Sequence, residues 1–513
     1  MGSIDQATPP NNNSPIGTIK SVAVIGAGIS GVSAAAHLLL AGFEVTVFER
    51  GGVVGGVWQY DSRLPLTPPF PNLAPPASDS QYNSTPDGLT ADEASIYHAS
   101  PSPCYAGLRN NIFITVMRSS LLEWPEGTGE LTTAEVVRAY IEDIARQYDV
   151  LAHTQLWTKV EKVSKKSGDA SWSVRTSKFS QTGDKFTYNR REWTFDAVIV
   201  ATGHYDVPRV PDIPGLAAWH ALFPDRVTHS KSYRDASPYK DSTVLLVGAG
   251  TSSSDIAMEV HAVGGRTYQV TRDLKRAASA QSEGLPESCE RVRAIKEFKL
   301  DFDSETQSLQ PPLQERDTIP GRVVLEDGQE LTDLHYVIVC TGYVTTYPFL
   351  GDLEQPNLPL EEADEEVIIT SDGYTVHNLH KDIFYIPDPT LAVIGVQHNV
   401  STFSLFDFQA RVVASVYKGY AQLLPKHELQ RLYRERKAKH QDEPEHKFHA
   451  LVMKDVTYAE GILEWVNAGL KRAGQPEIVP YDEKWYAGFE KMRALYAPRR
   501  PDLIPLEIKH QII

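Results

Sequence analysis

One stretch near the beginning of the sequence, SVAVIGAGISGVSAAAHLLLAGFEVTVFER at 21–50, constrains the fold most strongly. Its β-branched run 22–25 predicts a buried strand, and the Ala- and Leu-rich run 32–40 predicts a helix. Between them stand Gly26, Gly28 and Gly31, which permit a tight turn, close approach of a diphosphate, and packing of the helix against the strand. Residues 21–43 carry no Asp, Glu, Lys or Arg and are long enough for a membrane span, but the glycines favour a dinucleotide-binding unit.

The next predicted strand, 45–48, ends in an acid. Glu49 stands eighteen residues after Gly31, where a carboxylate can accept a hydrogen bond from a ribose hydroxyl. An acid at this position favours a free 2′-hydroxyl. The first unit therefore suits FAD or NAD.

A second unit of the same kind begins at residue 243. A predicted strand, 243–247, precedes Gly248, Gly250 and Ser253, which occupy the three glycine positions; serine is small enough for close packing. Ser252, in the same turn, is a further candidate for contact with the cofactor. The following strand, 267–271, leads to Arg272, which can pair with a 2′-phosphate and thus favours NADP; the alternative is a solvated surface cation.

One FAD-like site and one NADP-like site indicate a flavoprotein that takes hydride from NADPH. The three cysteines, Cys104, Cys289 and Cys340, are widely spaced, so we expect neither a disulfide framework nor the paired cysteines of a disulfide reductase. We also expect no metal site. The formal net charge of -16 disfavours nucleic acid as a partner, because phosphate backbones would be repelled.

Two apolar runs that end in Thr-Gly, within 196–208 and 335–350, are candidates for the passages between the two nucleotide units, although a plain strand followed by a turn explains them equally well. We expect an α/β fold with two Rossmann-like dinucleotide-binding domains, the NADP domain being inserted into the FAD domain. The expected divisions are a flexible tail at 1–19, FAD domain at 20–208, NADP domain at 209–335, and FAD domain with C-terminal helices at 336–513. Within 323–331, VVLEDGQEL predicts a hairpin with an Asp-Gly turn.

The segment between the first Thr-Gly run and the second glycine turn, FPDRVTHSKSYR at 223–234, resembles the fingerprint of the flavin-containing monooxygenases. That fingerprint, F-x-G-x-x-x-H-x-x-x-[FY]-[KR], is matched at Phe223, His229, Tyr233 and Arg234, with Asp225 in place of glycine. Similar segments are GGVW at 55–58, YAGLRNNIFITVM at 105–117 and FDFQARVVA at 406–414, so the resemblance covers about 20–420. It implies Gly56, Trp58 and His229 as cofactor-binding residues, with His229 a hinge and positioning residue.

The resemblance also implies an activity. NADPH reduces FAD, dioxygen forms a C4a-hydroperoxyflavin, and this species oxygenates a nitrogen or sulfur of a small molecule. Asn111 is the candidate catalytic residue, because an amide supplies a hydrogen bond without protonating the peroxide. Asn110 stands where the family usually has Thr, so either asparagine could be the one meant, and a turn-forming Asn pair is the alternative.

Other functions stay open. The Baeyer-Villiger monooxygenases, which act on ketones, look similar but carry Trp where Tyr233 stands. An uncoupled NADPH oxidase would only make peroxide. A flavin-binding regulatory protein that has lost turnover would explain Asp225 and Ser253 as signs of decay.

Between Trp58 and Tyr105 lies an insertion rich in Pro, Ser and Asp, which is either a lid over the substrate entrance or a solvated loop. The first nineteen residues are polar and lack the apolar region of a signal peptide, so we expect a cytoplasmic enzyme without a membrane anchor, with a homo-oligomer left open. The Asn-x-Ser/Thr matches at Asn12, Asn83 and Asn399 are then accidental.

Overall fold

The computed structural model describes residues 17–76, 87–165, 168–272, 284–302, 313–314, 316–441, 443–444, 447–451 and 454–496. Most of the predicted tail, together with Asn12 and Asn83, lies outside these ranges. The middle of the predicted lid, at 77–86, lies outside them as well.

The first predicted unit forms β1 (Ser21–Ile25), α1 (Ile29–Leu40) and β2 (Glu44–Phe48). These strands belong to a seven-stranded sheet of order β18-β19-β20-β7-β1-β2-β3. Its remaining strands are β3 (Thr154–Gln155), β7 (Ala197–Val200), β18 (Leu379–His380), β19 (Phe384–Tyr385) and β20 (Leu391–Val393). The five strands from β20 to β3 run parallel, as a dinucleotide-binding sheet requires.

The second unit forms a separate, entirely parallel sheet of order β12-β11-β10-β16-β9. Its strands are β9 (Val227–His229), β10 (Thr243–Val247), β11 (Arg266–Val270), β12 (Cys289–Val292) and β16 (Tyr336–Val339), and α5 (Thr251–Ala262) follows β10. The two-domain α/β prediction is thus confirmed. The expected boundary at 335 falls before β16, which pairs with β10 and β9, so we propose that the chain leaves the second unit after Val339.

Three smaller sheets complete the strands of the described chain. In the first, β4 (Thr158–Ser164), β5 (Trp172–Thr182) and β6 (Lys185–Phe195) are antiparallel. The second joins β13 (Ile295–Leu300), β14 (Gly321–Leu325) and β15 (Glu330–Leu331); its β14-β15 pair is the predicted Asp-Gly hairpin. In the third, β8 (Val207–Pro208) pairs with β17 (Tyr343–Val344), so the two segments that connect the nucleotide units run side by side.

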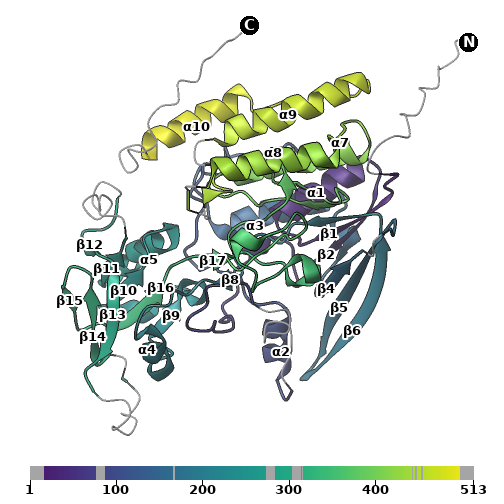
Figure 1. Ribbon diagram of the computed structural model, residues 1–513. Coiled ribbons are helices and arrows are strands. Elements are labelled where there is room, and N and C mark those ends of the chain that lie inside the picture. Colours follow the sequence, from purple (N-terminus) through teal and green to yellow (C-terminus); the bar gives the residue numbers. More distant parts are fainter. Residues whose placement is uncertain are drawn as a thin grey trace, which may run out of the picture.

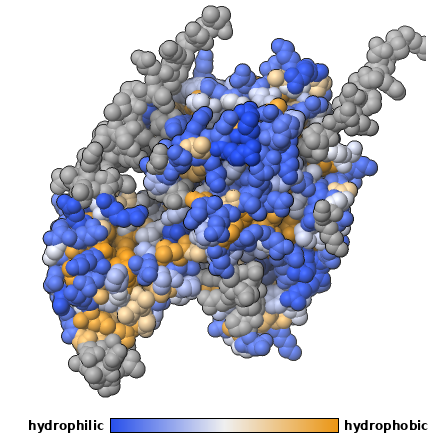
Figure 2. Space-filling model, viewed as in Figure 1, coloured by the Kyte–Doolittle hydropathy of each residue, from blue (hydrophilic) through white to orange (hydrophobic). Residues whose placement is uncertain are grey.

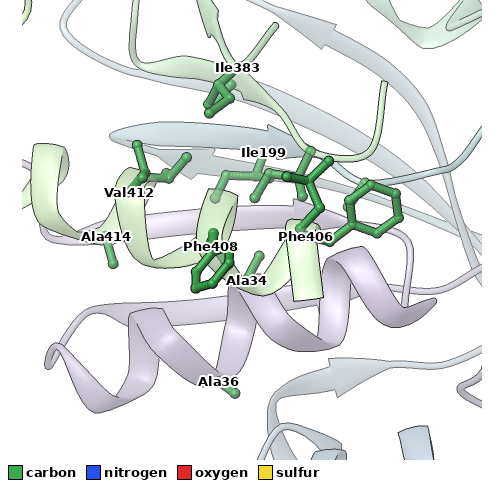
Figure 3. Packing of buried hydrophobic residues seen from close by; sticks show 14 of the residues in the cluster. Ala34, Ala36, Ile199, Ile383, Phe406, Phe408, Val412 and Ala414 are labelled. Carbon is green, nitrogen blue, oxygen red and sulfur yellow. The ribbon is translucent and has the colours of Figure 1, made fainter. Parts of the chain in front are cut away.

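The core of the first unit forms where α1 packs against α7 (Thr402–Tyr417). Figure 3 shows Ala34 on α1 beneath Phe408 on α7, with Ile199 of β7 in the layer above. The alanines of α1 are buried and leave room for the large side chains of α7. This packing fixes α1, whose first residues face the site described below.

The helices α8 (Lys426–Lys439), α9 (Asp455–Arg472) and α10 (Glu483–Tyr496) cover the first unit at the top of Figure 1. Trp485 of α10 is fully buried in the same core, whereas the face of α8 in Figure 2 is hydrophilic. None of the helices in the described residues has both the length and the apolar character needed to cross a membrane. The other helices are α2 (Ala91–His98), α3 (Ala134–Gln147) and α4 (Leu216–Leu222), and the 3-10 turns are η1 (Gly56–Trp58), η2 (Leu151–His153), η3 (Ser230–Ser232), η4 (Ser237–Tyr239), η5 (Pro348–Leu353) and η6 (Leu360–Glu362).

Candidate active site

A large cavity of about 2710 Å³ lies where the carboxyl ends of β1, β2, β10 and β11 open. Pockets for drug-sized ligands have about 300–1,000 Å³, so this cavity has room for two dinucleotides and a small substrate. Most of the predicted site residues line it, namely Gly26, Gly28, Glu49, Gly56, Trp58, Asn111, Gly248, Gly250, Ser252 and Arg272. The other three, Gly31, His229 and Ser253, are buried and are not among its lining residues.

Two glycines of the first turn, and Gly56 opposite it, are packed too tightly for a side chain. A Cβ added at Gly26, whose φ is +100°, would lie 2.6 Å from the Ala201 carbonyl oxygen, and one at Gly31 would lie 1.9 Å from the Gly26 oxygen. A Cβ on Gly56 would lie 2.9 Å from the Cα of Gly28. The backbone at Gly28 and Gly56 therefore forms a bare cradle at the cavity wall.

This cradle fits the diphosphate of FAD. Helix α1 begins at Gly28 without a side-chain cap and without an acid in its first turn, so its first N–H groups are free to bind an anion. Glu49 lies beside it. Its Oε2 accepts from the Ala27 N–H at 2.8 Å and its Oε1 from the Gly51 N–H at 2.7 Å, which holds the carboxylate where a ribose hydroxyl could donate to it.

The second glycine turn repeats this geometry with one change. Gly248 has φ +118°, and its added Cβ would lie 2.6 Å from the Cys340 carbonyl oxygen. This is the same distance as that from an added Cβ at Gly26 to the Ala201 oxygen. At the third position, the Ser253 hydroxyl donates to the Gly250 oxygen at 2.9 Å and accepts from the Gln269 amide at 2.9 Å. The serine thus replaces close glycine packing with hydrogen bonds. Helix α5, like α1, has a glycine N-cap and no acid in its first turn.

The two neighbouring asparagines have different environments. Asn110 is 2% exposed; its amide donates to the oxygens of Ile112 at 2.6 Å and Glu130 at 2.8 Å and accepts from the Thr132 N–H. Asn111 is exposed and lines the cavity. The structure therefore separates a turn-forming residue, Asn110, from a residue available to a ligand, Asn111.

His229 lies behind the cavity wall. Its Nδ1 accepts from the Lys231 N–H at 3.0 Å, so its Nε2 carries the hydrogen and donates to the Gly342 oxygen at 3.1 Å. Burial lowers the pKa of His229 to about 3, so the ring is neutral at physiological pH. The histidine joins the fingerprint segment to the second connecting segment, and its positioning role stays a prediction.

An ion cluster at the cavity wall, in which Lys231 is buried and Arg50 and Asp206 are partly exposed, was not predicted from the sequence. The Asp206 carboxylate lies 2.8 Å from Arg50 Nη1 and 2.9 Å from Lys231 Nζ, which also donates to the Ser100 hydroxyl at 3.1 Å. Burial alone would raise the pKa of Asp206, but the charges of Arg50 and Lys231 outweigh it and hold that pKa well below its usual range. The sequence signal was present, since Lys231 lies inside the fingerprint and Asp206 just after a Thr-Gly run.

The described parts of the insertion, 59–76 and 87–104, contact both nucleotide units. Phe70 stacks on His220 of α4 with ring centroids 3.9 Å apart, and Asn72 pairs with Val210. At the other end, His98 of α2 packs against Phe179 of β5. Figure 1 shows α2 beside β6, below the centre of the molecule. Both parts also line the cavity, which is the position that the lid prediction requires.

Three family models match the chain. The model described as flavin-binding monooxygenase-like matches 314–473, the NAD(P)-binding Rossmann-like domain matches 24–69, and pyridine nucleotide-disulphide oxidoreductase matches 123–386. In this chain Cys104, Cys289 and Cys340 are all free and buried.

Known proteins resemble the chain over nearly its whole length. Flavin-containing monooxygenase ustF2 of Aspergillus flavus is 36% identical, over 93% of this chain and 97% of its own. Among solved structures, S-allyl-L-cysteine S-oxygenase from Allium sativum has a TM-score of 0.68 at 23% identity and covers 94% of both chains. A cyclohexanone monooxygenase has a TM-score of 0.51 at 12% identity, covering 90% of this chain and 100% of its own, and so shares the fold.

Proposed function

This chain belongs to the flavin-containing monooxygenases, and from that premise we propose that it uses NADPH and O2 to oxygenate a nitrogen or sulfur atom of a small molecule. Its cofactors are FAD and NADPH. When bound, FAD supplies the chemistry of hydride acceptance and dioxygen activation. The route through a hydroperoxyflavin is part of the proposal.

The residues of the two glycine turns would hold the cofactors. In this proposal the N-terminus of α1, with Gly26, Gly28 and Gly56, binds the FAD diphosphate, and Glu49 binds the adenosine ribose. The N-terminus of α5 binds the NADPH diphosphate through the turn that contains Gly248, Gly250, Ser252 and Ser253. Arg272, exposed at the end of β11, pairs with the 2′-phosphate.

Asn111 would act at the reacting end of the cavity, by which we mean the part around Asn111 where the substrate would be oxygenated. Its amide can donate a hydrogen bond but cannot release a proton at physiological pH, so it can orient a reactive oxygen species without destroying it. Asn110 cannot serve in this way, because its amide already bonds the backbone on both sides of the turn. The insertion, as a lid, would exclude water from the same space.

The observation that carries the proposal is that one cavity receives both glycine turns and Asn111. Two dinucleotides bound at these turns would extend into a common space, where hydride can pass without a cofactor leaving. Two separate pockets would have argued for a different arrangement.

The test is product analysis with purified enzyme. FAD-loaded enzyme is given NADPH and O2 with panels of amines, sulfides and ketones, while NADPH consumption, hydrogen peroxide and oxygenated product are measured together. N-oxide, hydroxylamine or S-oxide in proportion to NADPH supports the proposal. Esters from ketones would indicate a Baeyer-Villiger enzyme, peroxide alone an oxidase, and bound FAD without NADPH oxidation a protein that has lost turnover; each of these results would overturn it.

A further inference from the structure

The helix that follows the second glycine turn carries two acids on one face. Asp255 and Glu259 are one turn apart on α5, and neither faces the sheet, because Ile256, Ala257 and Val260 do. Burial raises the pKa of both carboxyls. Two carboxylates one turn apart on the same helix face repel each other, so other contacts must offset that cost.

Two tyrosines from distant segments supply those contacts. The Tyr105 hydroxyl donates to Asp255 Oδ2 at 2.9 Å, and the Tyr233 hydroxyl donates to Glu259 Oε2 at 2.5 Å. Tyr233 is the aromatic residue of the fingerprint and is 2% exposed. The two rings meet edge to face with centroids 5.5 Å apart, so the four side chains form one cluster.

The cluster is attached to the segment that carries Asn111. Tyr105 begins this segment, and the next residue, Ala106, donates its N–H to the Arg234 oxygen at 2.8 Å. Gly107 lies against α5 so closely that an added Cβ would be 1.9 Å from Glu259 Oε1. Asn111 follows four residues later at the cavity. A shift of α5 must therefore move this segment or break these contacts.

We propose that Asp255 and Glu259 are positioning residues that, through Tyr105 and Tyr233, couple the NADP-binding helix to the segment bearing Asn111. Occupation of the second glycine turn is then transmitted to the reacting end of the cavity. This inference rests on the proposed function only in assigning α5 to NADP and Asn111 to the reaction. It concerns NADP+ binding and the ordering of residues 105–111, so its test needs no substrate for oxygenation.

The test uses FAD-loaded enzyme and NADP+ as the probe. Titration calorimetry gives the Kd for NADP+, and hydrogen exchange of residues 105–111 is followed with and without NADP+. In the wild type, NADP+ should slow exchange in this segment. Tyr105→Phe and Tyr233→Phe should each raise the Kd by up to about tenfold, the effect of losing one hydrogen bond to a charged group, and the double variant should lose the protection.

Conservative replacement separates coupling from folding. Glu259→Gln keeps an acceptor oxygen and should retain most of the protection, whereas Glu259→Ala should not. Tyr385→Phe is the matched control, because the Tyr385 hydroxyl also donates to an oxygen, that of Glu366 at 2.6 Å, but does not line the cavity. It should lower Tm without changing the Kd or the protection.

Wild-type Kd and protection in the double variant would overturn the coupling, as would equal losses in Tyr385→Phe. If the double variant fails to retain FAD, the single variants and the Glu259 pair decide. The two proposals can fail separately. Absence of oxygenated product would refute the proposed function and leave this coupling measurable. Hydrogen exchange that NADP+ does not slow would refute the coupling and leave the proposed function intact.

Discussion

Replacing Gly31 with alanine should deprive the enzyme of FAD. A Cβ at this position would lie 1.9 Å from the Gly26 carbonyl oxygen, whereas real Cβ contacts are essentially never shorter than 3.0 Å. The oxygen belongs to the main chain, and the position of the Cβ is fixed by the backbone of Gly31, so no side-chain rotation can relieve the clash. The start of α1 must move by more than about 1 Å relative to the turn that faces the cofactor.

The magnitude follows from overpacking in a fixed backbone. Forcing one extra methyl group into a well-packed site costs roughly 1–3 kcal/mol, and the backbone clash here suggests the upper end of that range. If about 2–3 kcal/mol of this cost weakens FAD binding, the Kd for FAD rises by roughly thirty- to two-hundredfold. The misplaced N–H groups of α1 and the altered Gly28–Gly56 cradle are the physical reason.

The assay is the ratio of flavin to protein after purification, followed by titration of the apoprotein with FAD. Gly461→Ala, in α9, is the matched control, because its added Cβ meets nothing within 4 Å; it should keep full flavin and gain up to about 1 kcal/mol of stability. A Gly31→Ala enzyme with wild-type flavin content and Kd would refute the reasoning.

Three further predictions follow from the site. Asn110→Ala should lower the free energy of unfolding by roughly 2–4 kcal/mol because it leaves buried backbone groups unpaired, whereas Asn111→Ala should keep Tm and release more peroxide per NADPH; equal Tm values for the two variants would contradict the assignment. Arg272→Ala should raise the KM for NADPH by about tenfold or more and leave that for NADH nearly unchanged, as steady-state kinetics with both would show. Outside the cavity lining, His229 and His377 are each 1% exposed, and burial lowers the pKa of both to about 3. Between that value and about 6.5 the unfolded chain binds more protons than the folded one, so stability falls as pH falls, by about 1.4 kcal/mol per pH unit for each histidine. Urea unfolding at pH 7.5 and 5.5 measures this, and equal midpoints would contradict it.

The two nucleotide units were predictable because their signals are local. Gly26, Gly28 and Gly31 have a fixed spacing, and the strand and helix around them follow from the pattern of apolar residues. The same logic found the β14-β15 hairpin from its Asp-Gly turn. The proposed shift of the boundary from 335 to beyond Val339 could not be predicted, because a strand that ends in Thr-Gly has the same pattern in either sheet, and only its pairing partners assign it.

The site was less predictable because its contacts join distant segments. Tyr105 and Asp255 are 150 residues apart, and nothing near either residue indicates their hydrogen bond. Asn110 and Asn111 have the same side chain, so only the direction in which each points separates a turn residue from a cavity residue. Arg50, Asp206 and Lys231 show the same limitation: each charge is visible in the sequence, but their convergence depends on the tertiary fold.

The pairing of β8 with β17 has a mechanical consequence. Both passages of the chain between the two nucleotide units run through this short ribbon. The Gly342 oxygen accepts from the Arg209 N–H, which extends the ribbon, and from His229 Nε2 of β9, which ties the ribbon to the second unit. Two separate tethers would let one body swivel and slide relative to the other, whereas a paired ribbon resists shear along its length and yields most easily by bending across its face. Any relative motion of the two units is thereby largely restricted to rotation about one axis, which crosses the ribbon.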